Sequence, residues 1–137
     1  MLTVSGYGGS RMAAFRSKFE QQIADYLTKR NIPFEYEGCK LSYTIPETKR
    51  NYIVDWQIGD NKNIIFESKG RLTSADRKKM LLVRDNNPEV VIRFIFMNSD
   101  VKIRKGSKTS YADWCRKNNF EFCDFRKGIP KQWLKNG

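Results

Sequence analysis

Residues 64–97 constrain the fold more strongly than any other part of the sequence. Ile64 to Lys69 has the composition of a strand, Ser74 to about Asp85 has the pattern of a helix, and Val90 to Met97 is an almost continuous apolar run. Such a run is typical of a strand at the centre of a covered sheet. A strand, a helix and a strand in this order predict a right-handed βαβ unit. The sequence therefore predicts an α/β fold.

The flanking segments predict additional elements around this unit. We expect a helix from about Ala13 to Lys29, ended by Pro33, and a polar hinge at residues 46–51. A Gly-rich arm is expected at residues 1–10, before a single domain that spans residues 11–137. The remaining expected elements are strands at 34–37 and 41–45 separated by Gly38, a helix at 110–118, a strand at 120–123 and a helical turn at 129–134. Together they predict a central mixed β-sheet flanked by helices.

Strand alternation places three charged residues on one face of a hairpin. In residues 52–58 Asp55 lies on the face opposite to an apolar set, Tyr52, Val54, Trp56 and Ile58. In the next strand Glu67 and Lys69 share a face. Asp55 stands opposite Glu67 if the intervening loop has an odd number of residues, whereas an even loop puts the two carboxylates on opposite faces. We therefore predict an odd loop.

The charge balance predicts a polyanionic partner. The chain has 26 Lys and Arg against 15 Asp and Glu, a net charge of +11, which is larger than ordinary surface design requires. The longest apolar run, Val90 to Met97, is interrupted by Arg93 and is too short to span a membrane, so DNA or RNA is favoured. A solvated basic face is the alternative for each cluster. The candidate phosphate contacts are Arg11, Arg16, Arg77, Lys78, Lys79, Lys102, Arg104, Lys105 and Lys108.

Histidine is absent from the sequence, which excludes Ser-His-Asp chemistry and most transition-metal sites. Catalysis must then depend on carboxylates, lysine, metal-bound water or tyrosine. The cysteines, Cys39, Cys115 and Cys123, lack the spacing of a zinc site. They are interpreted as reduced thiols, which predicts an intracellular, cytoplasmic protein.

Asp55, Glu67 and Lys69 together suit metal-dependent hydrolysis of phosphodiesters. Carboxylate oxygens are ligands for hard divalent cations, and the backbone carbonyl of Phe66 or Ser68 could add another oxygen. Lys69 could position the attacking water or stabilise the phosphate charge. Each residue also has an ordinary interpretation: Asp55 could pair with Lys69 or Arg50, and Glu67 with Lys69 could form a solvated face. As a set they favour a nuclease.

The order of an acidic helix residue, Glu20, a strand Asp and Glu67-Ser68-Lys69 resembles the PD-(D/E)XK nuclease superfamily, with Val54 in the position of its proline. A more specific resemblance, to the phage endonuclease I family, extends along nearly the whole chain. The matching segments are Gly6-Tyr7-Gly8, Ala14-Phe15-Arg16-Ser17, Phe34-Glu35-Tyr36-Glu37, Tyr43-Thr44-Ile45-Pro46, Glu67-Ser68-Lys69-Gly70, Asp76-Arg77-Lys78-Lys79 and Lys105-Gly106-Ser107.

This resemblance implies an endonuclease that resolves four-way (Holliday) junctions and other branched DNA by nicking two opposing strands with Mg²⁺ or Mn²⁺, two ions per site. It implies metal ligation by Glu20, Asp55, Glu67 and the Ser68 carbonyl, with Lys69 as the active-site lysine. It further implies an intertwined homodimer in which residues 11–45 swap across a bridge at 46–51, and Glu20 completes the partner's site. A phage-encoded protein of this kind would act in the host cytoplasm. The alternatives are a restriction- or repair-type nuclease of the same superfamily and a non-catalytic DNA-binding module.

Overall fold

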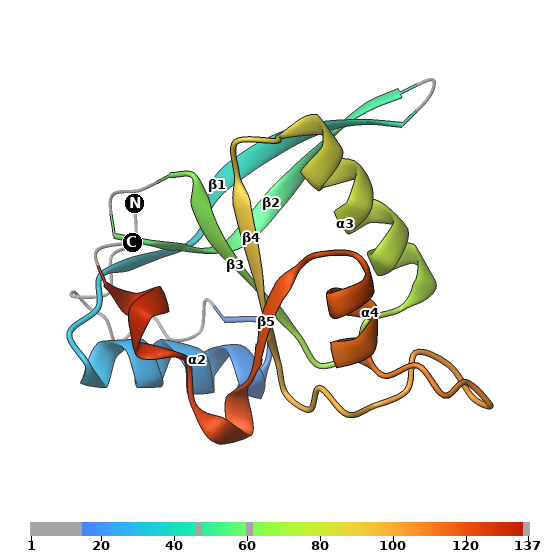
Figure 1. Ribbon diagram of the computed structural model, residues 1–137. Helices are drawn as coiled ribbons and strands as arrows, with labels where there is room; N and C mark the ends of the chain where they lie inside the picture. The colour runs from blue at the N-terminus through green and yellow to red at the C-terminus, as the bar shows by residue number, and fades with distance from the viewer. Residues whose placement is uncertain (1–14, 46–47, 60–61, 136–137) are drawn as a thin grey trace.

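A five-stranded mixed sheet forms the centre of the computed structural model, which describes residues 15–45, 48–59 and 62–135 (Figure 1). The strand order is β1-β2-β3-β4-β5. The first three strands pair antiparallel and the last three pair parallel. The predicted α/β fold with a mixed sheet is therefore confirmed. The strands are β1 Phe34–Ile45, β2 Thr48–Ile58, β3 Ile64–Lys69, β4 Val91–Phe96 and β5 Glu121–Asp124.

Helices cover both faces of this sheet (Figure 1). On one face α2 buries Ile23 and Leu27 in a cluster with Trp56 and Phe66. On the other face, α3 and α4 pack against a cluster built around Phe94. None of the helices in the described part of the chain has the length and apolar composition of a membrane span. The helices are α2 Lys18–Lys29, α3 Ser74–Asn86, α4 Tyr111–Lys117 and the short 3₁₀ segments η2 Phe125–Lys127 and η3 Lys131–Leu134.

The predicted βαβ unit consists of β3, α3 and β4. β3 and β4 pair in parallel from Ile64↔Val91 to Lys69↔Phe96. The helix α3 starts with a capping box, in which the Asp76 N–H donates to Thr73 Oγ1 (3.1 Å) and the Thr73 N–H donates to Asp76 Oδ2 (3.1 Å). This arrangement satisfies two backbone donors that the first turn would otherwise leave unpaired.

The β2/β3 hairpin has the predicted odd loop. Five residues, 59–63, separate Ile58 from Ile64, and Trp56 pairs with Phe66 while Gln57 pairs with Ile65. Continuing this register by one residue places Asp55 opposite Glu67. The parity argument from the sequence is therefore confirmed.

The first hairpin differs from the prediction in two ways. β1 is one continuous strand rather than two, because a bulge between Tyr36 and Cys39 absorbs the irregular segment. Glu37 takes a positive φ of 57° in this bulge, and a side chain at Gly38 would meet Glu35 Oε1 at 2.5 Å. Residues 48–51, expected in the hinge, instead belong to β2 and pair with residues 42–45. This pairing satisfies backbone hydrogen-bonding groups of these residues. Their polar side chains alone favour a connector over a strand.

The helix α2 also starts later than predicted. Ser17 is the N-cap, and its hydroxyl accepts a hydrogen bond from the Glu20 N–H (3.1 Å), so α2 begins at Lys18. The predicted arm at residues 1–10, Arg11 and the first two residues of the expected bridge, 46–47, lie outside the described residues.

Candidate active site

Asp55 is a buried carboxylate at the point where the β2/β3 ladder ends. The residue is only 5% exposed to solvent. Asp55 Oδ2 accepts hydrogen bonds from the Ser68 N–H (3.2 Å) and the Ser68 hydroxyl (3.1 Å). The carboxylate thus takes up a backbone donor of β3 just beyond the last paired residues, Trp56 and Phe66. Its position is fixed by the neighbouring strand.

The alternation of β2 breaks at Asp55. Tyr52 and Val54 belong to the apolar cluster on the α3 side of the sheet, whereas Trp56 and Ile58 belong to the cluster on the α2 side. The prediction that these four residues share one face is therefore wrong. The bulge in β1 lies directly across from this switch, since Tyr36 pairs with Trp56 and Cys39 pairs with Val54. Bulges of this kind commonly redirect side chains beside active sites.

Glu67 is buried next to Asp55 and forms an ion pair with the half-buried Lys69. Glu67 is 3% exposed; the Tyr52 hydroxyl donates to its Oε1, and Lys69 Nζ lies 3.2 Å from its Oε2. Lys69 Nζ also lies 3.4 Å from Asp76 Oδ1 at the start of α3. The lysine therefore bridges the strand carboxylate and the helix cap.

A single cavity joins these predicted site residues. It has a volume of about 370 Å³, and Asp55, Glu67 and Lys69 all line it. The same cavity contains side chains that the sequence analysis did not assign to the site. These are Glu37, Asn51, Tyr52 and Ile53. Tyr52 could not have been identified from strand alternation, because its contact with Glu67 depends on the break at Asp55.

Arg16 lies in this cavity among carboxylates. Its guanidinium contacts Glu37 Oε2 (2.7 Å), Asp55 Oδ1 (3.5 Å) and Glu20 Oε2 (3.8 Å). The side chain is nevertheless 67% exposed. Arg16 therefore supplies the local countercharge in this structure and retains room to move.

Glu20 does not line the cavity of its own chain. It is buried, and its Oε1 accepts hydrogen bonds from the Tyr36 hydroxyl (2.8 Å) and the Arg16 N–H (2.9 Å). Arg16 is its link to Asp55. Within residues 15–45, 48–59 and 62–135, no three acidic or thiol side chains come close enough to hold a metal ion by themselves. The structure thus brings Asp55, Glu67 and Lys69 together, whereas the Arg16 side chain lies between Glu20 and Asp55.

Burial controls the electrostatics of the two cavity carboxylates. It raises the pKa of Asp55 to about 6, against the hydrogen bonds from Ser68, while the nearby charge of Glu20 adds to the increase. Burial likewise raises the pKa of Glu67 to about 7, although Lys69 opposes this change. Raised values show that nearby cations compensate these carboxylates incompletely. Strong perturbation in a cavity is typical of functional sites.

Lys69 responds in the opposite sense from an ordinary buried lysine. Burial alone would lower its pKa, but Glu67 and Asp76 outweigh that effect and the pKa of Lys69 is raised. The group is therefore an ammonium cation at neutral pH.

The donor set fits a hard divalent cation. Asp55 and Glu67 provide carboxylate oxygens whose charged forms a cation would stabilise. The Ser68 N–H points toward β2, where it meets Asp55. Because the N–H and C=O of one residue point to the same side of a strand, the Ser68 carbonyl also faces the end of the β2/β3 ladder. Asp55, Glu67 and this carbonyl could hold the ion.

The predicted DNA contacts occupy different environments. Lys79 lines the cavity, with its ammonium 5.4 Å from the centre of the Tyr52 ring. Arg77 instead donates to the backbone carbonyl of Leu72 (2.9 Å) and ties α3 to the preceding turn. Arg11 lies outside the described residues. The exposed members are Lys78, Lys102, Arg104, Lys105 and Lys108.

Comparisons with known proteins identify the family of this chain. The sequence model of the family described as phage endonuclease I matches residues 1–137. The chain is 40% identical over 135 residues to "Endonuclease I" of Escherichia phage T7, covering 96% of this chain and 88% of that protein. It is 41% identical over 122 residues to "Endodeoxyribonuclease 1" of Enterobacteria phage T3, covering 89% of this chain and 78% of that protein. The chain belongs to the phage endonuclease I family.

Proposed function

We propose that this protein is a structure-selective endodeoxyribonuclease that resolves four-way junctions and other branched DNA by nicking two opposing strands. The observation that carries the proposal is the cavity in which Asp55, Glu67 and Lys69 meet. Membership of a family whose relatives bear the names Endonuclease I and Endodeoxyribonuclease 1 supports DNA as the substrate. The net charge of +11 supports binding to a polyanion. A phage origin would place the reaction in the host cytoplasm.

Asp55, Glu67 and the Ser68 carbonyl would hold Mg²⁺ or Mn²⁺, with Glu20 as a further ligand. When bound, such an ion supplies a water of lowered pKa and neutralises charge on the phosphate. The Ser68 hydrogen bonds orient Asp55, and the Tyr52 hydroxyl orients Glu67. These contacts fix the two carboxylates before substrate binds, which reduces the ordering required during the reaction.

Lys69 acts as a fixed positive charge in this proposal. Its ion pairs with Glu67 and Asp76 keep it protonated, so it stabilises negative charge on the phosphate rather than accepting a proton. Lys79 adds another cation in the same cavity. An ammonium is suited to this role because it attracts phosphate as a compact point charge.

Glu20 is proposed to act in the partner subunit of a homodimer. The resemblance to the phage endonuclease I family implies this arrangement, in which the segment that contains Glu20 is exchanged between the subunits. A mixed dimer of Glu20→Gln and Asp55→Asn subunits tests this idea. With Glu20 acting in trans, one site is intact and the other doubly altered, so the mixed dimer nicks one strand. If Glu20 acts within its own subunit, both sites are damaged and the mixed dimer is inactive.

Cleavage of a labelled four-way junction tests the function itself. Nicking in Mg²⁺ that stops in EDTA, with little cutting of plain duplex, is the expected result. Equal cutting of plain duplex would favour a restriction- or repair-type nuclease. Absence of nicking with intact junction binding would leave only a DNA-binding module.

A further inference from the structure

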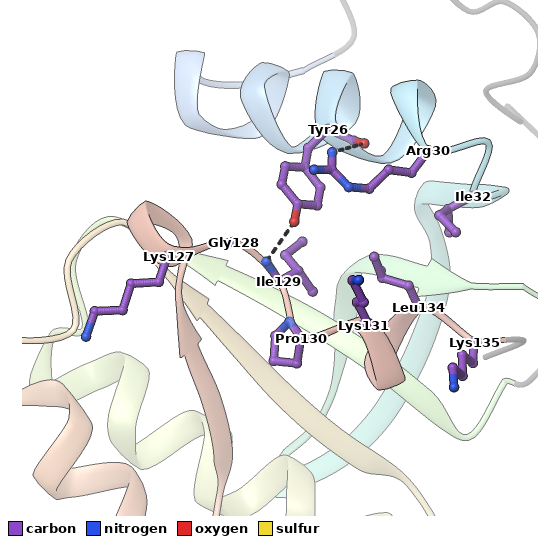
Figure 2. Close-up of a pocket in the computed structure, with 10 residues that line it drawn as sticks. All are labelled: Tyr26, Arg30, Ile32, Lys127, Gly128, Ile129, Pro130, Lys131, Leu134 and Lys135. Carbon is purple, nitrogen blue, oxygen red and sulfur yellow. Dashed lines mark hydrogen bonds between the residues drawn. The ribbon is translucent and has the colours of Figure 1, made fainter.

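A second hollow lies between α2 and the C-terminal segment. Its volume is about 670 Å³, and its lining shares no residue with the active-site cavity. The apolar part of its lining is formed by Ile32, Ile129, Pro130 and Leu134, and the charged part by Arg30, Lys127, Lys131 and Lys135. Figure 2 shows Arg30 on the α2 side of the hollow, with Lys131 and Lys135 across from it on the C-terminal segment. We call this hollow the C-terminal groove.

Among the described residues that line this groove, all four charged ones are cations. Among the ion pairs between described residues, none involves any of the four. Other basic residues of the protein are neutralised locally, for example Arg93 by Glu121 at 2.6 Å. A hollow lined by one sign of charge and by apolar walls concentrates the electric field and attracts the opposite charge. The groove is therefore suited to an anion.

The groove is held in place by a contact between distant parts of the chain. The Ile129 N–H donates to the Tyr26 hydroxyl (3.0 Å), as Figure 2 shows. Gly128 has a positive φ of 85°, and a Cβ there would lie 3.0 Å from the same hydroxyl. The Arg30 guanidinium lies 3.5 Å from the centre of the Tyr26 ring. The two walls of the groove are thus fixed relative to each other.

Its position relates the groove to the proposed substrate. α2 contains Glu20 near its start, and Arg30 caps its end. They are ten positions apart in the sequence, or ~15 Å along the helix axis at 1.5 Å per residue. Successive nucleotides of one strand are about 3.4 Å apart, so this span corresponds to roughly four or five nucleotides. In the proposed homodimer Glu20 completes the partner's site, so a DNA arm that leaves that site along α2 would bring its phosphates to the groove.

We propose that the C-terminal groove binds backbone phosphates of a duplex arm, about four or five nucleotides or more from the cleaved bond. This inference rests on the proposed function, because it assumes DNA as the substrate. Phosphate contacts carry no sequence information. The groove therefore contributes affinity and orientation, and it leaves the chemical step to the active-site cavity.

A charge-matched pair of variants tests the proposal. The groove variant is Lys127→Gln with Lys131→Gln and Lys135→Gln. The control variant is Lys40→Gln with Lys62→Gln and Lys117→Gln, three exposed lysines that line neither hollow. Both variants lower the net charge by three, so general attraction to DNA falls equally. Circular dichroism and thermal unfolding establish that both remain folded.

Binding is measured in EDTA by fluorescence anisotropy, with a labelled four-way junction and with plain duplex, at several salt concentrations. Each phosphate contact contributes roughly 0.9 to the slope of log K against log salt. The groove variant should lose about two to three units of slope and at least about tenfold in affinity. The control variant should lose less than about one unit. Equal losses in the two variants would overturn the proposal.

Ethylation interference locates the contact. Ethylated phosphates about four or five nucleotides from the cleavage position should weaken binding of the wild type and have no effect on the groove variant. Interference limited to the cleavage position would contradict the assignment. The two proposals are tested by different measurements. A wild type that fails to nick junctions in Mg²⁺ would contradict the proposed function. The salt slopes of the two variants, measured by binding to the junction and to plain duplex in EDTA, would still decide the role of the groove.

Discussion

Asp55 and Asp124 are buried carboxylates that make the same two hydrogen bonds, yet their pKa values shift in opposite directions. Asp55 Oδ2 accepts from the backbone N–H and hydroxyl of Ser68, and Asp124 Oδ2 accepts from the backbone N–H and hydroxyl of Ser99. Burial raises the pKa of Asp55 to about 6. The pKa of Asp124 is lowered well below its ordinary range, chiefly by hydrogen bonds from Arg126.

The nearest arginine explains the difference. The Arg126 guanidinium donates to both Asp124 oxygens, at 2.8 and 2.7 Å, whereas Arg16 approaches Asp55 only to 3.5 Å and is shared with Glu37 and Glu20. A two-point contact between guanidinium and carboxylate is among the strongest ion pairs in proteins. Asp124 is therefore fully compensated and structural. Asp55 retains the capacity to bind another cation.

Removal of the Asp55 charge should have the largest effect on activity. In Asp55→Asn, junction nicking in Mg²⁺ should fall by roughly 10³-fold or more, beyond the 10–100-fold typical of losing an outer partner of a metal site. Junction binding in EDTA should persist. The rate is measured under single-turnover conditions. Nicking within a few-fold of wild type would exclude Asp55 from the mechanism.

Asp55 and Asp124 should also make the free energy of unfolding depend on pH in opposite directions. For an acid whose folded pKa is raised, the free energy of unfolding falls as pH rises from the unfolded to the folded value. In EDTA, the protein should thus lose on the order of 5 kcal/mol between about pH 4 and 7 through Asp55 and Glu67 together. Asp124, with a lowered pKa, stabilises above its unfolded value and loses that contribution only as the pH falls below about 4.

Urea unfolding of wild type and Glu67→Gln across this range provides the measurement. The variant should show a flatter profile between pH 4.5 and 7, because Gln does not ionise. Identical profiles for the two proteins would show that Glu67 has no raised pKa in the folded state.

The opposite pattern from Asp55→Asn is expected for Asp124→Ala. This change leaves the buried Ser99 N–H without its acceptor, which should cost about 1–3 kcal/mol of unfolding free energy. Nicking at 25 °C should remain within a few-fold of wild type. Urea unfolding and the junction assay check the two parts. A stable but inactive protein would contradict the structural role of Asp124.

The smallest effect concerns the hydroxyl that orients Glu67. Tyr52→Phe removes its hydrogen bond to Glu67 and should reduce the nicking rate by about 2–10-fold, in line with the loss of one hydrogen bond. Tyr43→Phe is the matched control, because Tyr43 lies in the same apolar cluster outside the cavity. An equal reduction in both variants would show that the effect comes from packing rather than from the position of Glu67.

Short-range patterns predicted much of this molecule. The βαβ unit followed from strand and helix periodicity, and the meeting of Asp55 with Glu67 followed from loop parity. The continuous β1 and the change of face in β2 could not be predicted, because both depend on how a bulge in one strand meets its partner. The place of Arg16 among three carboxylates arises from tertiary packing of separate segments, which sequence spacing does not encode.

Asp76 limits how freely this protein could be redesigned. One oxygen of its carboxylate closes the first turn of α3 and the other lies 3.4 Å from Lys69. At an ordinary helix start, Ser, Thr, Asp and Glu can often be exchanged at small cost. Here a designer who optimises the helix alone would also change the charge that faces Lys69. Thermostabilising substitutions in the first turn of α3 should therefore be selected by activity as well as by melting temperature.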